Sequence, residues 1–210
     1  MKSMENLFYV GLISIIIVFG MGMYFTGAVS HESPSTASAT GEHSYNLTLV
    51  ITNQNYMQSQ NHMQPAYYVL QDGKLLSSAQ IYIPANSIIN LTIINYDYGP
   101  GTVPAQYSKV MGTLNGTEYV VNDTNVNMSA SQRGQYVKSV PSADLAHTFT
   151  IPKLGLNIMV PSDSIVSAQF QTGGPGVYGW QCQVDCGTGP SGWNGAMATP
   201  GWMMGQVIIQ

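Results

Sequence analysis

Charged residues are the first thing that this sequence has little of. Only 8% of its 210 residues are Asp, Glu, Lys or Arg, against roughly 25% in ordinary soluble proteins. No run of basic residues and no basic-aromatic face occurs, which argues against nucleic acid as a partner. The shortage of charge is compatible with an acidic exterior, because a fold with few ionisable groups depends less on pH. Lineage bias or glycan cover would explain it equally well.

Catalytic signatures are also absent. The sequence contains no nucleophile-base-acid set, no phosphate-binding loop, no paired-carboxylate motif and no zinc signature. It also lacks a convincing amphipathic helix after the first thirty residues. We therefore expect no catalysis by this chain alone, and its place within a larger enzyme stays open.

Only one apolar run is long enough to cross a membrane. Residues 7–29 carry no charge, and that length spans a bilayer. Lys2 precedes the run, which favours the N-terminus inside the cell. Ala28-Val29-Ser30 would also fit the cleavage site of a signal peptide, but the run exceeds the usual apolar core of about 7–15 residues. The pattern favours an uncleaved, single-pass anchor in residues 1–30, with residues 7–29 in membrane lipid.

Everything after the anchor is expected on the extracytoplasmic side of the cell membrane. Residues 31–43 are rich in Ser, Thr and Ala and are typical of a flexible linker. Five N-x-[ST] triplets follow and give weak support to an outside location.

Residues 44–210 have the pattern of an all-β domain. Short stretches of β-branched and aromatic residues are separated by Gly, Pro and Asn turns, as in a β-sandwich of antiparallel sheets. We expect strands at 45–52, 79–85, 88–96, 147–152, 156–161, 164–171, 176–182 and 205–210. An irregular insertion at about 97–143 interrupts them, and we expect a hairpin within it over Val110–Val121, turning at Asn115-Gly116.

Both cysteines of the chain lie near its C-terminus, in YGWQCQVDCGTGPSGWNGAM. Cys182, Cys186 and Met197 stand between two expected strands, and His147 lies on an earlier one. Thiolate and thioether sulfur stabilise Cu(I), while imidazole suits both oxidation states of copper. A rigid β-scaffold that holds a histidine on one strand and sulfur atoms on a loop is therefore a candidate copper site.

The same residues resemble a known family. DLAHTFTIPKLGLNIMVP, followed by PGVYGWQCQVDCGTG, is similar to the copper-binding domain of cytochrome c oxidase subunit II, in the cupredoxin superfamily. The matching positions are His147-Thr148-Phe149, Pro152, Leu154-Gly155, Tyr178, Cys182, Cys186, Gly187 and Met197. The likeness covers residues 144–210 well and residues 45–95 only as a strand pattern. It implies a cupredoxin-like Greek-key β-sandwich, preceded here by one N-terminal transmembrane helix.

The resemblance also implies a ligand set. In that family two thiolates bridge two copper ions, and two histidines, a methionine and a backbone carbonyl complete the coordination. Here these would be Cys182, Cys186, His147, Met197 and the carbonyl of Val184. The second histidine is missing, because Asn194 stands at its place and asparagine is a poor copper ligand. His62 is a further candidate for the vacancy. We therefore expect a mononuclear site with His147, Met197 and one or both thiolates.

Each of these residues also has a simpler interpretation. His147 fits a hydrogen-bonded core histidine, and Met197 fits a packing residue. The cysteine pair fits a disulfide, which is common in exported proteins. We expect a membrane-anchored copper protein that transfers single electrons to a redox partner in a respiratory chain. The alternatives are a subunit II-like component of a haem-copper terminal oxidase, and a metal-free structural β-sandwich closed by a Cys182–Cys186 disulfide.

Overall fold

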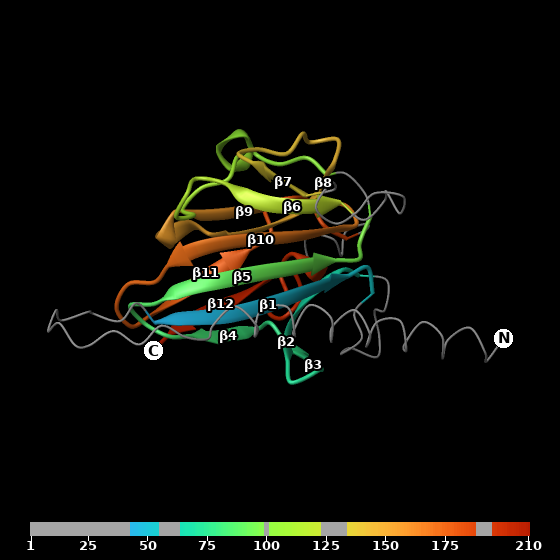
Figure 1. Cartoon of the computed structure of the whole chain (residues 1–210). Helices are drawn as coiled ribbons and strands as arrows, with labels where there is room; N and C mark the ends of the chain where they lie inside the picture. The colour runs from blue at the N-terminus through green and yellow to red at the C-terminus, as the bar shows by residue number, and fades with distance from the viewer. Residues whose placement is uncertain (1–42, 55–63, 99–100, 123–133, 188–194) are drawn as a thin grey trace, which may run out of the picture. The chain divides into compact units, whose positions relative to one another are not determined.

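A computed structural model describes residues 43–54, 64–98, 101–122, 134–187 and 195–210. These residues form twelve strands in two sheets (Figure 1). The seven-stranded sheet has the order β3-β2-β1-β5-β10-β6-β7, and the five-stranded sheet has the order β4-β12-β11-β8-β9. The strands are β1 (Ser44–Thr52), β2 (Ala66–Gln71), β3 (Lys74–Ser77), β4 (Gln80–Ile83), β5 (Ile88–Asn95), β6 (Glu118–Asn122), β7 (Gly134–Val137), β8 (Leu145–Ile151), β9 (Leu156–Pro161), β10 (Ser164–Gln171), β11 (Gly176–Gln181) and β12 (Met204–Ile209).

The core lies between the two sheets. In β5 and β10 every second residue is buried, so each strand turns one face inward and one outward. In β8 and β9 every residue is buried. A bulge interrupts β8 just before His147, because Leu145 pairs with Pro161 while His147 pairs with the adjacent Val160. Such bulges re-aim side chains and are common beside functional sites.

The prediction of an all-β domain with two sheets is confirmed, but the prediction of purely antiparallel sheets is wrong. β1 pairs with β5 in parallel, and β12 pairs with β4 in parallel. Between β1 and β5 the chain crosses to the other sheet to form β4. A strand that returns to its own sheet after such a crossover can run in the same direction as its neighbour.

The hairpin of β2 and β3 was not predicted. Its turn is Asp72-Gly73, and both residues have positive φ angles, of 51° and 72°. Asp-Gly is a strong sequence signal for this kind of two-residue turn. The strand pattern is weak here because every residue of β3 is exposed.

The insertion is more regular than predicted. It contains a short 3-10 helix, η1 (Ala105–Tyr107), and the β6–β7 hairpin. The predicted hairpin over Val110–Val121 is wrong, because its first arm pairs elsewhere: Met111 forms a bridge with Asn157 of β9. The side-chain carboxyl of Glu118 accepts the N–H of Met159, also on β9, at 2.9 Å. The insertion thus supplies hydrogen-bond partners to backbone groups on the outer edge of β9. As an edge strand, β9 would otherwise expose these groups unpaired.

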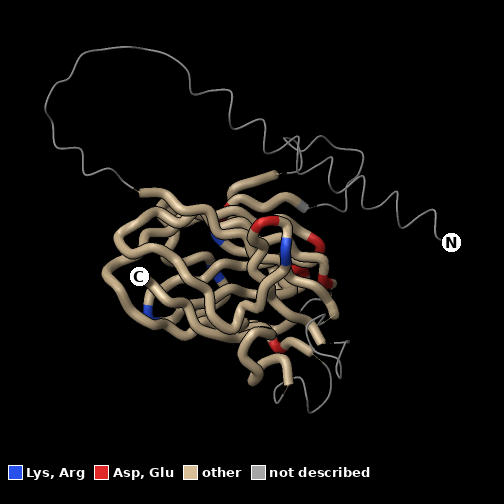
Figure 2. The backbone as a smooth tube through the Cα atoms, turned by 90° about the horizontal axis from the view of Figure 1, so that it is seen from below, with Lys and Arg blue, Asp and Glu red and all other residues tan. Residues whose placement is uncertain are grey.

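Charged positions are sparse along the backbone of the domain (Figure 2). Among the described residues, no helix is long and apolar enough to cross a membrane. The predicted span at residues 7–29 lies outside the described residues, as does nearly all of the predicted linker. Both stay predictions.

Candidate metal centre

Three of the predicted ligands converge in the folded domain. His147 comes from β8, Cys182 directly follows β11, and Cys186 lies four residues further on. Their ligand atoms all lie within 4.8 Å of one another. Each side chain is buried, with exposed fractions of 2%, 1% and 6%. Two strands of the five-stranded sheet therefore bring an imidazole and two thiols into one dry cluster.

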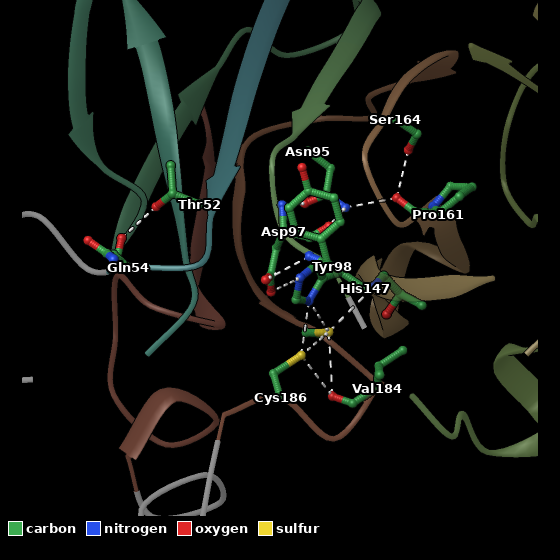
Figure 3. A network of polar contacts seen from close by, with 12 residues as sticks. Thr52, Gln54, Asn95, Asp97, Tyr98, His147, Pro161, Ser164, Val184 and Cys186 are labelled. Atoms are coloured by element: carbon green, nitrogen blue, oxygen red, sulfur yellow. Dashed lines mark hydrogen bonds and ion pairs between the residues drawn. The ribbon is translucent and has the colours of Figure 1, made fainter. Parts of the chain in front are cut away.

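The atoms face each other directly (Figure 3). Nδ1 of His147 lies 3.0 Å from Sγ of Cys186 and 3.9 Å from Sγ of Cys182. The two sulfurs are 3.2 Å apart and are not bonded to each other. The carbonyl oxygen of Val184 lies 3.5 Å from the Cys182 sulfur and 3.2 Å from the Cys186 sulfur. The imidazole nitrogen and the carbonyl oxygen thus each lie beside both sulfurs.

Backbone hydrogen bonds hold the cysteine loop in place. The N–H of Cys182 donates to the carbonyl of Met203 at 2.8 Å, and the N–H of Met203 donates to the carbonyl of Ala196 at 3.0 Å. The N–H of Thr148 points at the Cys182 sulfur at 3.4 Å, and its hydroxyl accepts the N–H of Gln183 at 2.8 Å. The Cys182 sulfur is therefore positioned by β8 and by the residues just before β12.

The remaining predicted ligands have different outcomes. Met197 is 3% exposed and belongs to the hydrophobic core of the domain, so its role as a ligand stays a prediction. The Val184 carbonyl faces both sulfurs, as the resemblance implies. His62 and Asn194 lie outside the described residues.

One residue of the site was not predicted. Oδ2 of Asp97 lies 2.9 Å from Nε2 of His147, on the side of the ring away from the sulfurs (Figure 3). Asp97 precedes His147 by fifty residues and stands at the start of the insertion. No local pattern marks it, because its role depends on how the loop after β5 packs against β8.

The pKa values reflect this crowding of polar groups. Burial alone would lower the pKa of His147, but its hydrogen bonds to Asp97 and Cys182 raise that pKa to about 9. Burial would likewise raise the pKa of Cys182, but contacts with Cys186 and His147 hold it well below its usual range. The contact with Cys182 and burial raise the pKa of Cys186. Without a metal these shifts favour a thiolate at Cys182 beside a protonated His147, and metal binding has to displace the proton that faces the sulfurs.

An aromatic cluster lies behind the histidine. The ring of Tyr67 on β2 meets the imidazole edge-to-face, with centroids 6.3 Å apart. Trp180 and Phe149 pack against Tyr67 at 5.1 Å and 6.1 Å. These buried rings exclude water and prevent the imidazole from moving away from the sulfurs.

Gly101 leaves room for the cysteine loop. A Cβ at this position would overlap Cγ1 of Val184, whose side chain is buried. We expect Gly101→Ala to displace Val184, to lower the free energy of unfolding by about 1–3 kcal/mol and to speed the alkylation of both thiols. Gly179→Ala on β11 is the matched control, since a Cβ there meets nothing within 4 Å. Equal thiol reactivity in the two variants would contradict this role, and urea titrations with timed thiol labelling measure both effects.

Comparisons with known proteins add weak likenesses. No protein-family model matches the chain, and no curated protein matches it. Three solved structures show the range of similarity. A heme-copper terminal oxidase dimer contains a chain of 14% identity, with a TM-score of 0.38 and coverage of 99% of this chain and 95% of that one. Auracyanin B has 15% identity, a TM-score of 0.32, and coverage of 87% and 94%. Rusticyanin from Thiobacillus ferrooxidans has 14% identity, a TM-score of 0.34, and coverage of 93% and 94%.

At these identities and TM-scores, the function of this chain has to be inferred from its own residues. The buried cluster of His147, Cys182 and Cys186 is compatible with a cupredoxin copper site.

Proposed function

We propose that this chain is a copper protein that carries single electrons. The observation that supports this most directly is the buried set of one imidazole nitrogen and two thiol sulfurs within 4.8 Å. When bound, copper supplies the one-electron couple between Cu(II) and Cu(I). The chain supplies soft sulfur donors for Cu(I) and an imidazole that suits both states.

The donor set favours copper over structural zinc. Structural zinc sites have four nitrogen or sulfur ligands in a closed tetrahedron. Among the described residues this centre offers three such strong donors, with the Val184 carbonyl beside the sulfurs and the Met197 thioether as the weak donor that the sequence pattern predicts. Three strong donors with weak axial ones are typical of copper electron-transfer sites.

The scaffold suits electron transfer because it resists movement. His147 lies on a strand that is buried throughout, and Cys182 is tied by its backbone to Met203. An electron carrier works fastest when its ligands barely move between oxidation states. The further elements of the proposal are an anchor at residues 7–29, an extracytoplasmic domain and a redox partner in a respiratory chain, and these are supported by the sequence pattern.

Copper reconstitution of the purified, reduced full chain tests this function. We expect one copper per chain, an intense thiolate-to-copper absorption band in the visible region, and a four-line EPR hyperfine pattern. Two free thiols per chain are expected before copper is added. No copper uptake, together with thiols that remain unreactive until a disulfide reductant is added, would favour the metal-free structural sandwich and overturn the proposal.

His147→Ala is expected to abolish the absorption band and the EPR signal, since it removes the only imidazole that faces the sulfurs among the described residues. His43→Ala is the matched control, because His43 is exposed and contributes only its backbone carbonyl to a hydrogen bond with Ile88. An unchanged spectrum in His147→Ala would remove this residue from the ligand set.

A subunit II-like role in a haem-copper oxidase is the second candidate. The Val184 carbonyl favours it, because its oxygen faces both sulfurs, as the family's dinuclear centre requires. A seven-line EPR pattern with two coppers per chain would support this role. Copurification with a haem protein would separate a permanent subunit from a free carrier.

A further inference from the structure

The loop that follows β5 is tied to the other sheet. Asn95, the last residue of β5, is buried, and its side-chain amide donates to the carbonyl of Pro161 at the end of β9, at 2.8 Å. The same amide lies 3.3 Å from the carbonyl of Asp97, and its Oδ1 accepts the N–H of Asp97 at 3.0 Å. The side chain of Asn95 therefore fixes the backbone of Asp97 by hydrogen bonds.

The other polar atoms of Asp97 are also in use. Its carbonyl accepts the N–H of Asp163 at 3.1 Å, and its Oδ1 accepts the N–H of Tyr98 at 2.8 Å. Only Oδ2 remains, and it meets Nε2 of His147 at 2.9 Å. Figure 3 shows the imidazole between this carboxylate and the two sulfurs. The carboxylate is thus fixed from several sides before it reaches the ring.

We propose that Asp97 is the positioning residue of the metal centre: its fixed carboxylate holds the proton of His147 on Nε2 and presents Nδ1 to the sulfurs. A neutral imidazole has one donor nitrogen and one acceptor nitrogen, and the partner of one decides the state of the other. A carboxylate on Nε2–H leaves the lone pair of Nδ1 free for a metal. It also increases the basicity of the ring as a ligand.

This inference rests on the proposed function, and two variants separate the roles of the carboxylate. Asp97→Ala removes the hydrogen bond, and we expect about 10–100-fold weaker copper binding, the usual cost of losing such a partner. Asp97→Asn keeps an oxygen that accepts from Nε2–H but removes the charge. We expect it to keep most of the affinity while its reduction potential rises, because Cu(II) gains more than Cu(I) from a nearby negative charge.

Asp144→Asn is the matched control. Asp144 is exposed, and its hydrogen bonds are backbone ones, to Pro141 and Ser162. Asp144→Asn removes the same negative charge as Asp97→Asn but changes no contact of the His147 ring. We therefore expect wild-type copper affinity and reduction potential. Chelator competition, EPR spectra and potentiometric titration of the full chain provide the measurements, and thermal melts of the copper-free variants establish that they fold.

Wild-type protein that takes up no copper would overturn the proposed function. Wild-type protein that binds copper while Asp97→Ala has unchanged affinity, spectrum and potential would overturn the positioning role alone. The positioning role would also be overturned if Asp144→Asn shifts the reduction potential as far as Asp97→Asn does. In the copper-free wild type, ¹⁵N-edited NMR should show a slowly exchanging Nε2–H on His147. That resonance should be lost in Asp97→Ala, and its persistence there would also contradict the assignment.

Discussion

Glu118 is expected to lower the free energy of unfolding of the wild-type domain by about 5 kcal/mol between pH 4.5 and pH 8, and Glu118→Gln is expected to remove this contribution. Glu118 is only 1% exposed. Burial raises its pKa from 4.5 to about 8, while the hydrogen bond from Met159 opposes the rise. At about 1.4 kcal/mol per pH unit, this difference corresponds to about 5 kcal/mol.

The sign follows from the two states of the chain. The folded protein holds Glu118 neutral up to pH 8, whereas the unfolded chain ionises it from about pH 4.5 upward. Its contribution to stability is therefore complete below pH 4.5 and is lost as the pH rises through 8. Besides burial, the group that acts on this carboxyl is the Met159 N–H from β9. The pKa of Tyr67 from β2 is raised chiefly by burial, and the charge of Glu118 contributes to that rise.

Urea titrations of the reduced, copper-free protein from pH 4 to pH 9 measure the effect. The difference between wild type and Glu118→Gln isolates this carboxyl, because the other titrating groups are common to both proteins. Asp72→Asn is the control, since Asp72 lies on the exposed turn between β2 and β3, where asparagine also tolerates the positive φ. Parallel pH profiles of wild type and Glu118→Gln would contradict the prediction. The expected loss of stability with rising pH would suit a protein in an acidic exterior. Such an exterior is one explanation of the low content of charged residues.

Trp180→Ala is expected to lower the free energy of unfolding by about 3–5 kcal/mol. Trp180 lies on β11, 1% exposed, and packs against Tyr67 and Phe149 with ring centroids 5.1 Å and 5.4 Å away. Its indole N–H donates to the carbonyl of Ser78 at 3.1 Å. Truncation would leave a cavity between the sheets and a buried carbonyl without its partner, and each of these costs free energy.

Two variants on the same strand calibrate this result. Trp180→Phe keeps most of the ring volume but loses the hydrogen bond, so we expect an intermediate loss. Val177→Ala is the control, because Val177 is 57% exposed and should change stability by less than about 0.5 kcal/mol. Chemical denaturation monitored by circular dichroism provides the free energies. If Trp180→Ala loses no more than Val177→Ala, the aromatic cluster does not support the fold.

Much of the architecture was predictable because it depends on local patterns. β9 and β10 match the expected strands at 156–161 and 164–171, since both are β-rich runs bounded by turn residues. The parallel pairing of β1 with β5 was not predictable, because it depends on where the chain crosses between sheets. The insertion was misjudged for a similar reason: Met111 and Glu118 find their partners on β9, about forty residues away.

The donor types of the site follow from the amino-acid sequence alone, because Cys182 and Cys186 are four residues apart on one loop and carry their chemistry wherever that loop lies. The sequence also indicated His147, because the strand motif His147-Thr148-Phe149 precedes the turn at Leu154-Gly155. The folded domain was needed to find which nitrogen of His147 faces the sulfurs, that Asp97 holds the opposite nitrogen, and that Gly101 makes room for Val184. These contacts join residues that are 39 to 83 positions apart, and only the packing of two sheets and the loops between them brings such residues together.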